Sequence, residues 1–317
     1  MILILFDEGN GDFLKKYISL LAAACVFLCG CEIKMETPAD TEETLPVIVT
    51  TELTSVSIAE PTPFPVTVND IVFDKAPERI ISLSPSLTEI LFEMGYGDKI
   101  VGRGSYCDYP PEIEGTADAG RPSKPDLDTI IAIKPDVLFT ATSIPVKDKY
   151  KLEENGIKIV YIPYPESIEE FQRIYSAIGL IFEGIFDGEE VGKKAFSDLQ
   201  NSIDSANIEL GKFVYITEGM TIATGDTFES SFLSFFGTNI GADGKEYGYP
   251  KEYLTEFQPD VIILNDNYTV DDLLADEIYS TLNAVTEGKV YCISNTYFER
   301  PSKRITELIE ELSAIGG

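Results

Sequence analysis

The chain has 317 residues, of which 44% are hydrophobic, so it is long enough to build two lobes with their own cores. Its 24 basic residues are outnumbered by 54 acidic ones, and the formal charge of −30 disfavours nucleic acid and anionic membrane surfaces as partners. Histidine and tryptophan are absent. The first absence excludes a histidine general base, a Ser-His-Asp triad and histidine metal ligation, and the second leaves Tyr and Phe to form any aromatic ligand surface.

The amino-terminal segment has the pattern of a targeting signal. An apolar run follows Lys15 and Lys16, is short for a membrane span and ends in LCGC. LCGC resembles a bacterial lipobox, so residues 1–31 are predicted to be a lipoprotein signal peptide with Cys31 as the lipidated residue. An ordinary cleaved signal or an uncleaved anchor is the alternative. Residues 32–67, acidic and rich in Thr and Pro, are predicted to form a solvated tether.

Short apolar runs alternate with helical patterns over residues 68–166. This alternation is typical of a parallel sheet covered by helices, and it predicts an amino-terminal α/β lobe. The predicted strands cover residues 79–83, 99–101, 136–140 and 157–162. The predicted helices cover residues 85–95, 126–133 and 147–154.

Residues 167–211 form a predicted helical spacer, with a break around residues 184–188. The alternation of strands and helices restarts over residues 212–317, which predicts a carboxyl-terminal α/β lobe. Its predicted strands cover residues 213–217, 260–264 and 289–293. Its predicted helices cover residues 230–236, 253–257, 270–282 and 301–315. The fold class is therefore predicted to be α/β, with two similar lobes flanking the spacer.

One phrase occurs once in each predicted lobe. An acidic residue, Asp128 or Glu252, stands seven residues before a Pro-Asp pair that opens a β-branched run. The proline ends a helix and the run enters a buried strand, so the phrase marks the same helix-to-strand step in both halves of an internal duplication. Taken alone, both acids are explained by the helix dipole, which favours carboxylates in the first turn of a helix.

Four motifs occur in order along the folded part: RIISLSPSLTEILFEMG, GRGSYCDYPPE, DLDTIIAIKPDV and YFERPSKRI. Together they resemble the substrate-binding proteins of ABC importers for cobalamin, ferric siderophores and haem, and SYCDYPP and FERPSKRI are most similar to the cobalamin-binding branch. The resemblance implies two Rossmann-like lobes joined by a single long rigid helix, with the ligand held between them. It also implies that one surface acid per lobe, here Asp128 and Glu252, docks to the permease dimer. Asp128 departs from the glutamate usual at its position.

Ligands of open α/β sheets bind beyond the carboxyl ends of the strands, so the loops at those ends are the candidate cleft. The resemblance matches Tyr106 to a ring-contacting tyrosine and puts Tyr247 and Tyr249 near a large aromatic position of the second lobe. The other candidate ligand contacts on these loops are Ser84, Ser86, Arg103, Arg121, Tyr297, Phe298 and Arg300. Packing of Tyr106, helix capping by one serine and ion pairing of the arginines with local acids are the alternatives.

These features predict a monomeric, lipid-anchored solute-binding protein on the outer face of the bacterial cytoplasmic membrane. It would deliver a corrinoid to an ABC permease dimer with its ATPase. No catalysis, cofactor or metal site is expected, because no base accompanies a candidate nucleophile. The tryptophans of the cobalamin branch are missing, so a ferric siderophore or haem stays open as the cargo, and the cleft arginines suit such anions. A cell-surface adhesion or signalling lipoprotein is the alternative of a different class.

Overall fold

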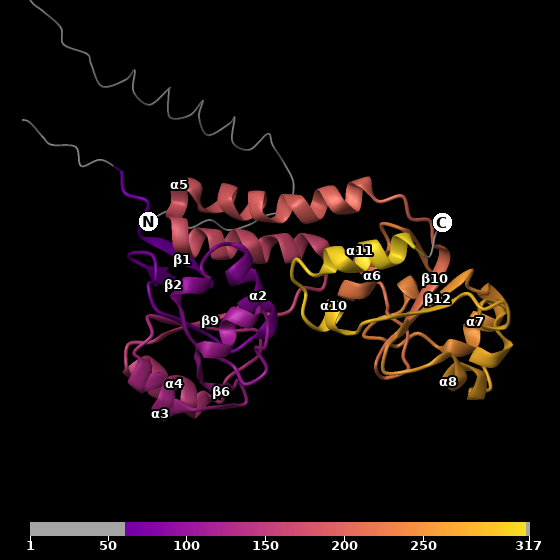
Figure 1. The fold of residues 1–317 in the computed structure, drawn as a ribbon, viewed down its shortest axis with the longest axis horizontal. Helices are drawn as coiled ribbons and strands as arrows, with labels where there is room; N and C mark the ends of the chain where they lie inside the picture. The colour runs from indigo at the N-terminus through magenta and orange to yellow at the C-terminus, as the bar shows by residue number, and fades with distance from the viewer. Residues whose placement is uncertain (1–60, 315–317) are drawn as a thin grey trace, which may run out of the picture. The chain divides into compact units, whose positions relative to one another are not determined.

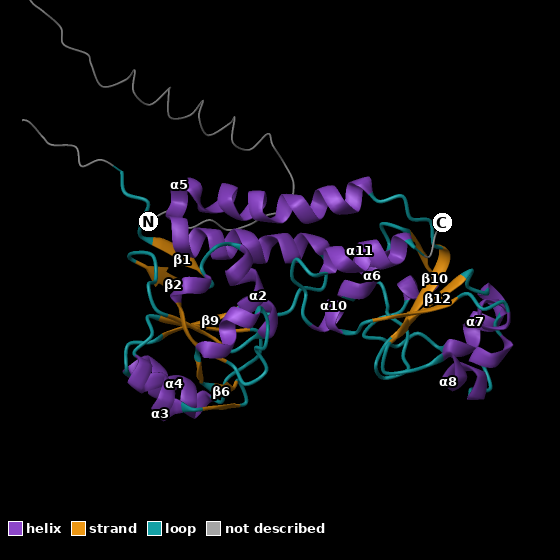
Figure 2. Ribbon diagram, viewed as in Figure 1, coloured by secondary structure: helices purple, strands orange, loops and turns teal. Residues whose placement is uncertain are grey.

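A computed structural model describes residues 61–314, which belong to one compact unit. The predicted signal peptide, Cys31 and most of the predicted tether lie outside the described residues. The described part consists of two α/β lobes, each built on a parallel sheet and connected by the helical element α5, Ile168–Ser205 (Figures 1 and 2). The predicted fold class is confirmed.

The amino-terminal lobe holds a five-stranded parallel sheet in the order β5-β4-β3-β8-β9. Its strands are β3 Ile80–Ser82, β4 Ile100–Arg103, β5 Ala117–Asp118, β8 Val137–Thr140 and β9 Lys158–Tyr161. Its helices are α2 Pro85–Glu93, α3 Leu127–Ile133 and α4 Val146–Glu154. Strands β3 and β8 are buried at every residue, which is why their sequences are continuous apolar runs rather than alternating ones.

The carboxyl-terminal lobe holds a four-stranded parallel sheet in the order β11-β10-β12-β13. Its strands are β10 Gly211–Ile216, β11 Gly237–Asn239, β12 Val261–Asn265 and β13 Val290–Ile293. Its helices are α6 Phe228–Leu233, α7 Leu254–Phe257, α8 Val270–Ala275, α9 Asn283–Thr286, α10 Thr296–Glu299 and α11 Ile305–Ser313. Short 3-10 helices are η1 Gly97–Lys99, η2 Pro111–Gly115, η3 Ile240–Asp243, η4 Lys251–Tyr253 and η5 Tyr279–Thr281.

Two predicted helices of this lobe are shorter in the structure. The helix predicted over residues 270–282 stops at Ala275, because the next carboxylate, Asp276, accepts hydrogen bonds from the backbone of Ile278 and Tyr279 at 2.8 and 3.1 Å. The helix predicted from residue 301 begins at Ile305 instead. The residues before it form a loop that contacts the other lobe.

The repeated Pro-Asp phrase has the same structural role in both lobes. The Asp136 carboxylate, at the start of β8, accepts the backbone N–H groups of Glu78 and Arg79 at 2.8 and 2.9 Å. In the second lobe the Asp260 carboxylate accepts the backbone N–H of Lys212 at 2.8 Å. Each aspartate thus satisfies backbone donors where the neighbouring strand, β3 or β10, begins. The strand orders also correspond, with β3, β8 and β9 matching β10, β12 and β13.

Element α5 reverses direction at Gly184, where the predicted break falls. Gly184 has φ 79° and ψ −170°, a conformation that residues with a Cβ avoid. The two segments then pack closely as an antiparallel pair, because a Cβ on Gly179 would lie 2.1 Å from the carbonyl oxygen of Gly188. The single long connecting helix that the resemblance implies is therefore divided into two antiparallel segments (Figure 1).

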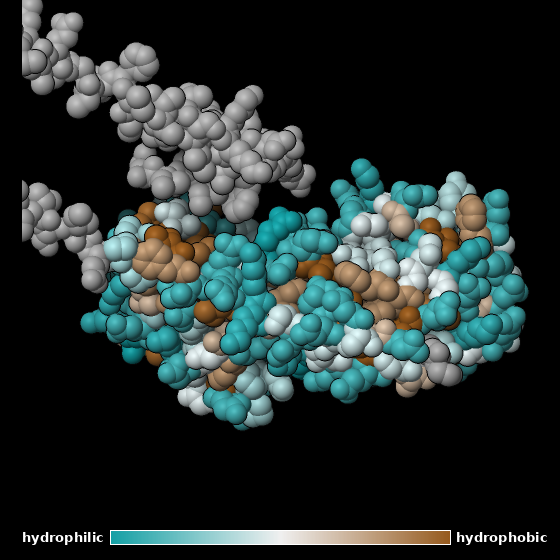
Figure 3. Space-filling view, turned by 90° about the horizontal axis from the view of Figure 1, so that it is seen from above, coloured by the Kyte–Doolittle hydropathy of each residue, from teal (hydrophilic) through white to brown (hydrophobic). Residues whose placement is uncertain are grey.

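The two lobes share one hydrophobic core on the side of α5. A continuous cluster joins β1 and α2 of the first lobe, through Phe171, Tyr175 and Phe196 of α5, to β10 and α11 of the second. Separate clusters fill the far face of each sheet. Because interiors this densely packed deform little, the shared core opposes large movements of one lobe against the other. The surface on the α5 side is mainly hydrophilic, with small hydrophobic areas between (Figure 3).

A short hairpin precedes the first lobe and changes its predicted boundary. Strands β1, Val66–Val68, and β2, Ile71–Phe73, pair antiparallel, and Val66 and Phe73 are buried in the shared core. Pro63 also accepts a hydrogen bond from the backbone of Ile185 at 2.9 Å. The predicted tether end at residue 67 is therefore wrong, since these last residues are packed against α5. Two further short strands, β6 Gly120–Arg121 and β7 Lys124–Pro125, pair antiparallel with each other.

Candidate functional site

A cavity of about 430 Å³ lies between the two lobes at the carboxyl ends of their strands. It is lined by Pro85, Tyr106, Tyr164, Phe298, Glu299 and Arg300. The first three residues follow β3, β4 and β9, and the last three belong to the segment after β13. Crevices at this end of parallel sheets are the usual ligand sites of α/β proteins, and the cavity lies where the loops after the strands predict a cleft.

Tyr106 lines this cavity, and Arg121 packs on its ring. The Tyr106 side chain is 52% exposed, and the Arg121 guanidinium carbon lies 4.5 Å from the centre of its ring. This cation–π contact holds the ring in place without burying it. The arrangement presents an aromatic face beside a positive charge, which suits a flat ligand that carries polar or anionic groups.

Arg300 enters the cavity from the second lobe. Its guanidinium donates a hydrogen bond to Asp108 Oδ1 at 2.6 Å, so the predicted ion pairing of an arginine with a local acid occurs here across the lobes. Phe298 is mostly buried among Tyr215, Phe228 and Phe232 and also lines the cavity. The residues that line the cavity therefore include one cation, Arg300, and one carboxylate, Glu299, both from the second lobe.

Ser84 and Ser86 lie buried at the start of α2, beside Pro85. Ser84 is the N-cap of α2 and accepts the backbone N–H of Leu87 at 3.4 Å. Ser86 donates its hydroxyl hydrogen to the carbonyl oxygen of Pro301 at 2.5 Å. Helix capping accounts for Ser84, and the hydroxyl of Ser86 is committed to the other lobe, so neither hydroxyl is presented freely to a ligand.

Arg103 supports the cleft from behind rather than lining it. It donates to the carbonyl oxygens of Gly104 and Cys107 at 3.2 Å each, within the loop that carries Tyr106. Its Nε atom is buried and has no hydrogen-bond partner among residues 61–314. The structure thus assigns Arg103 to the support of residues 104–107 instead of the predicted ligand contact.

Tyr247 and Tyr249 do not line the cavity. The Tyr247 hydroxyl lies 3.3 Å from both carboxylate oxygens of Glu229, and the Tyr249 ring packs edge-on against Tyr253 at a centroid distance of 6.0 Å. Burial raises the pKa of Glu229, while a hydrogen bond from its own backbone and others from Thr227 and Tyr247 lower it. Burial and the neighbouring Glu229 raise the pKa of the Tyr247 phenol well above its usual range.

Tyr297, a predicted ligand contact, does not line the cavity. Tyr297 is buried on α10, and its hydroxyl donates to Glu311 Oε1 of α11 at 2.7 Å. The residue lies on a helix directly after β13, and the sequence pattern does not show which side of that helix faces the core. Its neighbour Phe298 is the aromatic residue of this pair that reaches the cavity.

Tyr164 is a cleft residue that the sequence analysis missed. It follows β9, whose carboxyl end points to the same crevice as those of β3 and β4, so the same rule of strand ends would have found it. Burial raises the pKa of the Tyr164 phenol, and a hydrogen bond with Ser84 opposes that rise. The hydroxyl is neutral near pH 7 and is able to donate to a ligand acceptor.

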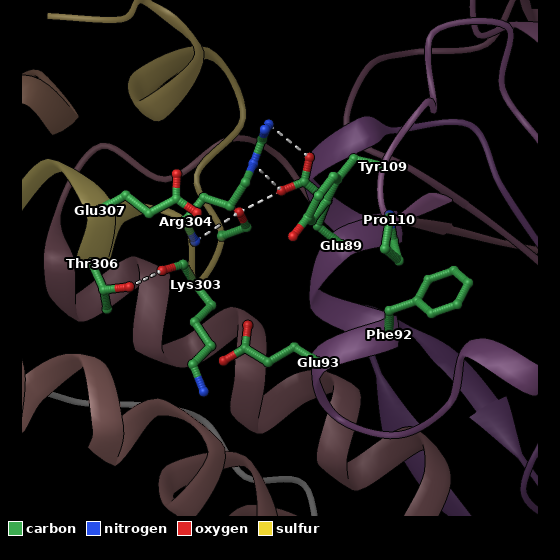
Figure 4. A pocket seen from close by; sticks show the side chains of 10 residues that line it. Glu89, Phe92, Glu93, Tyr109, Pro110, Lys303, Arg304, Thr306 and Glu307 are labelled. Atoms are coloured by element: carbon green, nitrogen blue, oxygen red, sulfur yellow. Dashed lines mark hydrogen bonds and ion pairs between the residues drawn. The ribbon is translucent and has the colours of Figure 1, made fainter. Parts of the chain in front are cut away.

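A second cavity of about 400 Å³ also lies between the lobes (Figure 4). Glu89, Phe92 and Glu93 of α2 face Lys303 and Arg304 of the second lobe across it. Arg304 donates to both carboxylate oxygens of Glu89, at 3.0 and 3.1 Å, and stacks over the Tyr109 ring at 4.7 Å. Burial raises the pKa of Glu89, while the hydrogen bond from Ser302 and the charge of Arg304 lower it.

The two repeated acids lie on the surface, Asp128 in α3 and Glu252 in η4, which directly precedes α7. Both α3 and α7 lie away from α5 (Figure 1). The Asp128 side chain is 100% exposed in the first turn of α3, 3.9 Å from Lys151 Nζ. Glu252 is exposed in η4. The N-cap of α3 is Asp126, which accepts the backbone N–H of Thr129 at 3.1 Å, so capping does not account for Asp128.

Exposed apolar side chains accompany each of these acids. Val146 and Tyr150 of α4 lie exposed in the helix that carries Lys151, the partner of Asp128. Tyr253, next to Glu252, and Phe257 of α7 are exposed in the second lobe. Exposed aromatic side chains around a charged residue are typical of protein-protein contact surfaces.

The chemistry of the site is that of binding. The cavity residues are aromatic, basic and acidic, without a nucleophile held against a base. Among residues 61–314, no group of three or more acidic or sulfur side chains is arranged to hold a metal ion. In the same range, no helix has both the length and the apolar character needed to cross a membrane. Cys107 is a buried free thiol and Cys292 an exposed one.

Comparison with known proteins gives consistent matches. The sequence profile of the periplasmic binding protein family matches residues 80–297. An uncharacterized ABC transporter substrate-binding lipoprotein of Bacillus subtilis, YvrC, is 26% identical over 95% of this chain and 97% of its own length. A vitamin B12-binding protein of Vibrio cholerae is 27% identical over 74% of this chain and 87% of its own.

Solved structures agree with these sequence matches. The periplasmic vitamin B12 binding protein BtuF of Vibrio cholerae superposes with a TM-score of 0.57 at 25% identity, covering 75% of this chain and 96% of its own. The periplasmic haem binding protein HutB of the same organism gives a TM-score of 0.63 at 16% identity, over 75% of this chain and 98% of its own. The second likeness concerns the fold alone.

Proposed function

The chain belongs to the periplasmic binding protein family, as its four motifs predict, and on this premise we propose that it captures a corrinoid outside the cytoplasmic membrane and delivers it to an ABC permease. The relatives that cover most of the chain are a substrate-binding protein of an ABC transporter and vitamin B12-binding proteins. A protein of this kind binds and releases its ligand without chemical change.

The observation that carries the proposal is the aromatic cavity between the lobes. Tyr106, Tyr164 and Phe298 come from three different segments and surround one space of about 430 Å³. Flat aromatic faces suit the surface of a macrocycle, and phenol hydroxyls suit the amide groups at its edge. The cavity is within the range of small-molecule sites.

A ferric chelate is the second candidate cargo, favoured by Arg121 and Arg300. Arg300 lines the cavity and Arg121 packs on the ring of Tyr106, which also lines it. Planar guanidinium groups pair well with carboxylate and catecholate oxygens. Their present partners are the Tyr106 ring and the Asp108 carboxylate. A chelate with several negative charges would compete for these arginines, whereas a corrinoid would leave the Arg300 ion pair intact.

We also propose that a lipid anchors the chain to the membrane and that two surface acids dock it to the permease. Cys31 in LCGC is the proposed lipidated residue, and the relative in Bacillus subtilis is named a lipoprotein. Asp128 and Glu252 are the proposed contacts to the two permease subunits, because each is exposed at the same step of a duplicated lobe. An anchor on the outer face of the membrane keeps both acids within reach of the permease.

The test is ligand-dependent thermal unfolding of the full chain in mild detergent. Cyanocobalamin, cobinamide, a panel of ferric siderophores and haem are compared at equal concentrations. A ligand that binds only the folded state adds roughly 2.7 kcal/mol at about 100 times its dissociation constant, which raises the melting temperature by several degrees. A shift with corrinoids alone supports the proposal, a shift with a siderophore or haem alone replaces the cargo, and no shift with any ligand favours a surface adhesion or signalling role.

A further inference from the structure

Residues 300–304, which we call the strap, cross from the second lobe to the first. The strap follows α10 and precedes α11, and its backbone and side chains bind α2 and the loop after β4. Ser86 of α2 donates to the carbonyl oxygen of Pro301 at 2.5 Å, and Arg300 donates to Asp108 at 2.6 Å. The strap therefore holds the second lobe against the first at the edge of the cavity.

Glu89 accepts the hydrogen bonds from the other end of the strap, Ser302 and Arg304. Its Oε2 atom accepts the Ser302 hydroxyl at 2.6 Å and Arg304 Nε at 3.0 Å, and its Oε1 atom accepts a terminal nitrogen of Arg304 at 3.1 Å (Figure 4). The Glu89 side chain is only 3% exposed. Charge-assisted hydrogen bonds away from water are stronger than neutral ones at the surface, so this carboxylate holds the strap more firmly than a surface pair would.

Glu89 acts on the cavity without lining it. The cavity residues Phe298 and Glu299 stand directly before the strap and Arg300 is its first residue, whereas Glu89 lines the second cavity. With Pro301 held by Ser86 and Arg304 held by Glu89, the chain between them has little freedom to move. A shift of the strap would displace Arg300 first, because it is the end of the strap that reaches the cavity.

We propose that Glu89 is a positioning residue for ligand binding, which fixes the strap and thereby holds Phe298, Glu299 and Arg300 at the cavity. The inference rests on the proposed function for its ligand but not for its geometry. Residues that orient a binding site from behind affect affinity even though they touch no ligand. The proposal gives the buried ion pair between the lobes a role beyond stability.

The affinity test compares Glu89→Gln with Glu183→Gln in the full chain, using whichever ligand of the panel binds the wild-type protein. Glu183 is the matched control, since it accepts a hydrogen bond from Tyr96 at 2.9 Å and has no contact with the strap. We expect the Glu89 variant to bind about tenfold more weakly, with faster dissociation, and the control to bind as the wild type does. Equal affinity of both variants would overturn the proposal.

Ser302→Ala provides a second test in case the Glu89 variant does not fold. It removes the hydrogen bond to Glu89 and the one that the Ser302 hydroxyl accepts from the backbone N–H of Arg304 at 3.3 Å. The pair between Arg304 and Glu89 stays in place, so we expect about threefold weaker binding with a melting temperature close to that of the wild type. If folded Ser302→Ala protein binds with wild-type affinity while Glu89→Gln does not fold, Glu89 is a stability residue and the proposal is wrong.

A fluorescence measurement tests the strap without any ligand. The chain has no tryptophan, so Tyr109→Trp introduces a single emitter at the ring over which Arg304 stacks. Adding Glu89→Gln should release Arg304 and shift the emission to longer wavelength, whereas adding Glu183→Gln should not. If no ligand of the panel binds but this shift occurs, the proposed function fails and the strap geometry stands; an unchanged spectrum would refute the positioning role.

Discussion

The guanidinium carbon of Arg121 lies 4.5 Å from the ring centre of Tyr106, an exposed residue that lines the cavity between the lobes. Tyr106→Ala should therefore weaken ligand binding by about tenfold or more, because an aromatic contact surface is removed and Arg121 loses the group that orients it. Isothermal titration with the ligand identified by thermal unfolding measures the effect.

The free energy of unfolding should change little in the same variant, by less than about 1 kcal/mol, since the ring is half exposed. Tyr150→Ala is the matched control: it removes an exposed tyrosine of the same lobe that lies on α4, away from the cavity. Equal loss of affinity in both variants would contradict a specific role for Tyr106.

Gly184 should tolerate no side chain. Its φ of 79° with ψ of −170° strains any residue with a Cβ, and an added Cβ would lie 2.4 Å from the carbonyl oxygen of Pro63. We expect Gly184→Ala to lower the free energy of unfolding by roughly 1–3 kcal/mol or more, measured by urea denaturation with circular dichroism. Gly115→Ala is the control, since its added Cβ meets no atom within 4 Å and its φ is negative.

Glu229 should make the protein less stable as the pH rises. Burial raises its pKa above the usual 4.5, so the folded state binds this proton more tightly than the unfolded state does. The free energy of unfolding then falls as the pH increases from the usual glutamate value through the raised value. Glu229→Gln should remove this part of the pH dependence in a series of urea titrations.

Asp272 should act in the opposite direction. Hydrogen bonds from the backbone and hydroxyl of Thr269 hold its pKa below the usual 3.8. Its stabilising contribution is therefore present above that value and is lost as the pH falls through the lowered pKa. Asp272→Asn should remove the loss of unfolding free energy at acid pH and leave the pH dependence that comes from Glu229 unchanged. If Asp272→Asn and Glu229→Gln changed the pH dependence of the unfolding free energy in the same way, the assignment would be contradicted.

Asp128 and Glu252 should be required for delivery of the ligand to the permease and not for binding of the ligand. The double variant Asp128→Ala and Glu252→Ala should bind ligand with unchanged affinity and lose at least about tenfold of the ligand-stimulated ATP hydrolysis of a co-reconstituted permease. Asp128→Glu, which adds one methylene, should support hydrolysis at least as well as the wild type. Asp74→Ala removes a similarly exposed aspartate and is expected to have no effect.

The sequence predicts the order of the elements well, because local patterns decide it. The apolar runs of β3, β8, β10 and β12 mark buried parallel strands, and prolines and caps mark the starts of α2 and α3. The hairpin of β1 and β2 was missed because its short strands lie next to a stretch rich in Thr and Pro, and their burial depends on contact with the distant α5.

The site is predicted less completely, because sequence spacing identifies a loop but not the direction of its side chains. Tyr106 and Arg300 face the cavity as expected, whereas Arg103 turns back to its own loop and Tyr297 turns into the core. Glu89 gives no signal of its role in the sequence. Its partner Arg304 stands 215 residues away, and only the packing of the two lobes brings them together.

The strap also affects the order in which features of the molecule form during synthesis. Both parallel sheets are fully encoded once the chain has grown to residue 293. The hydrogen bonds from residues 300–304 to the first lobe form only after the chain has left the ribosome through Arg304. A nascent chain that ends just before Arg300 therefore has both sheets but neither α11 nor these hydrogen bonds between the lobes, so the cavity forms later than the sheets on either side of it.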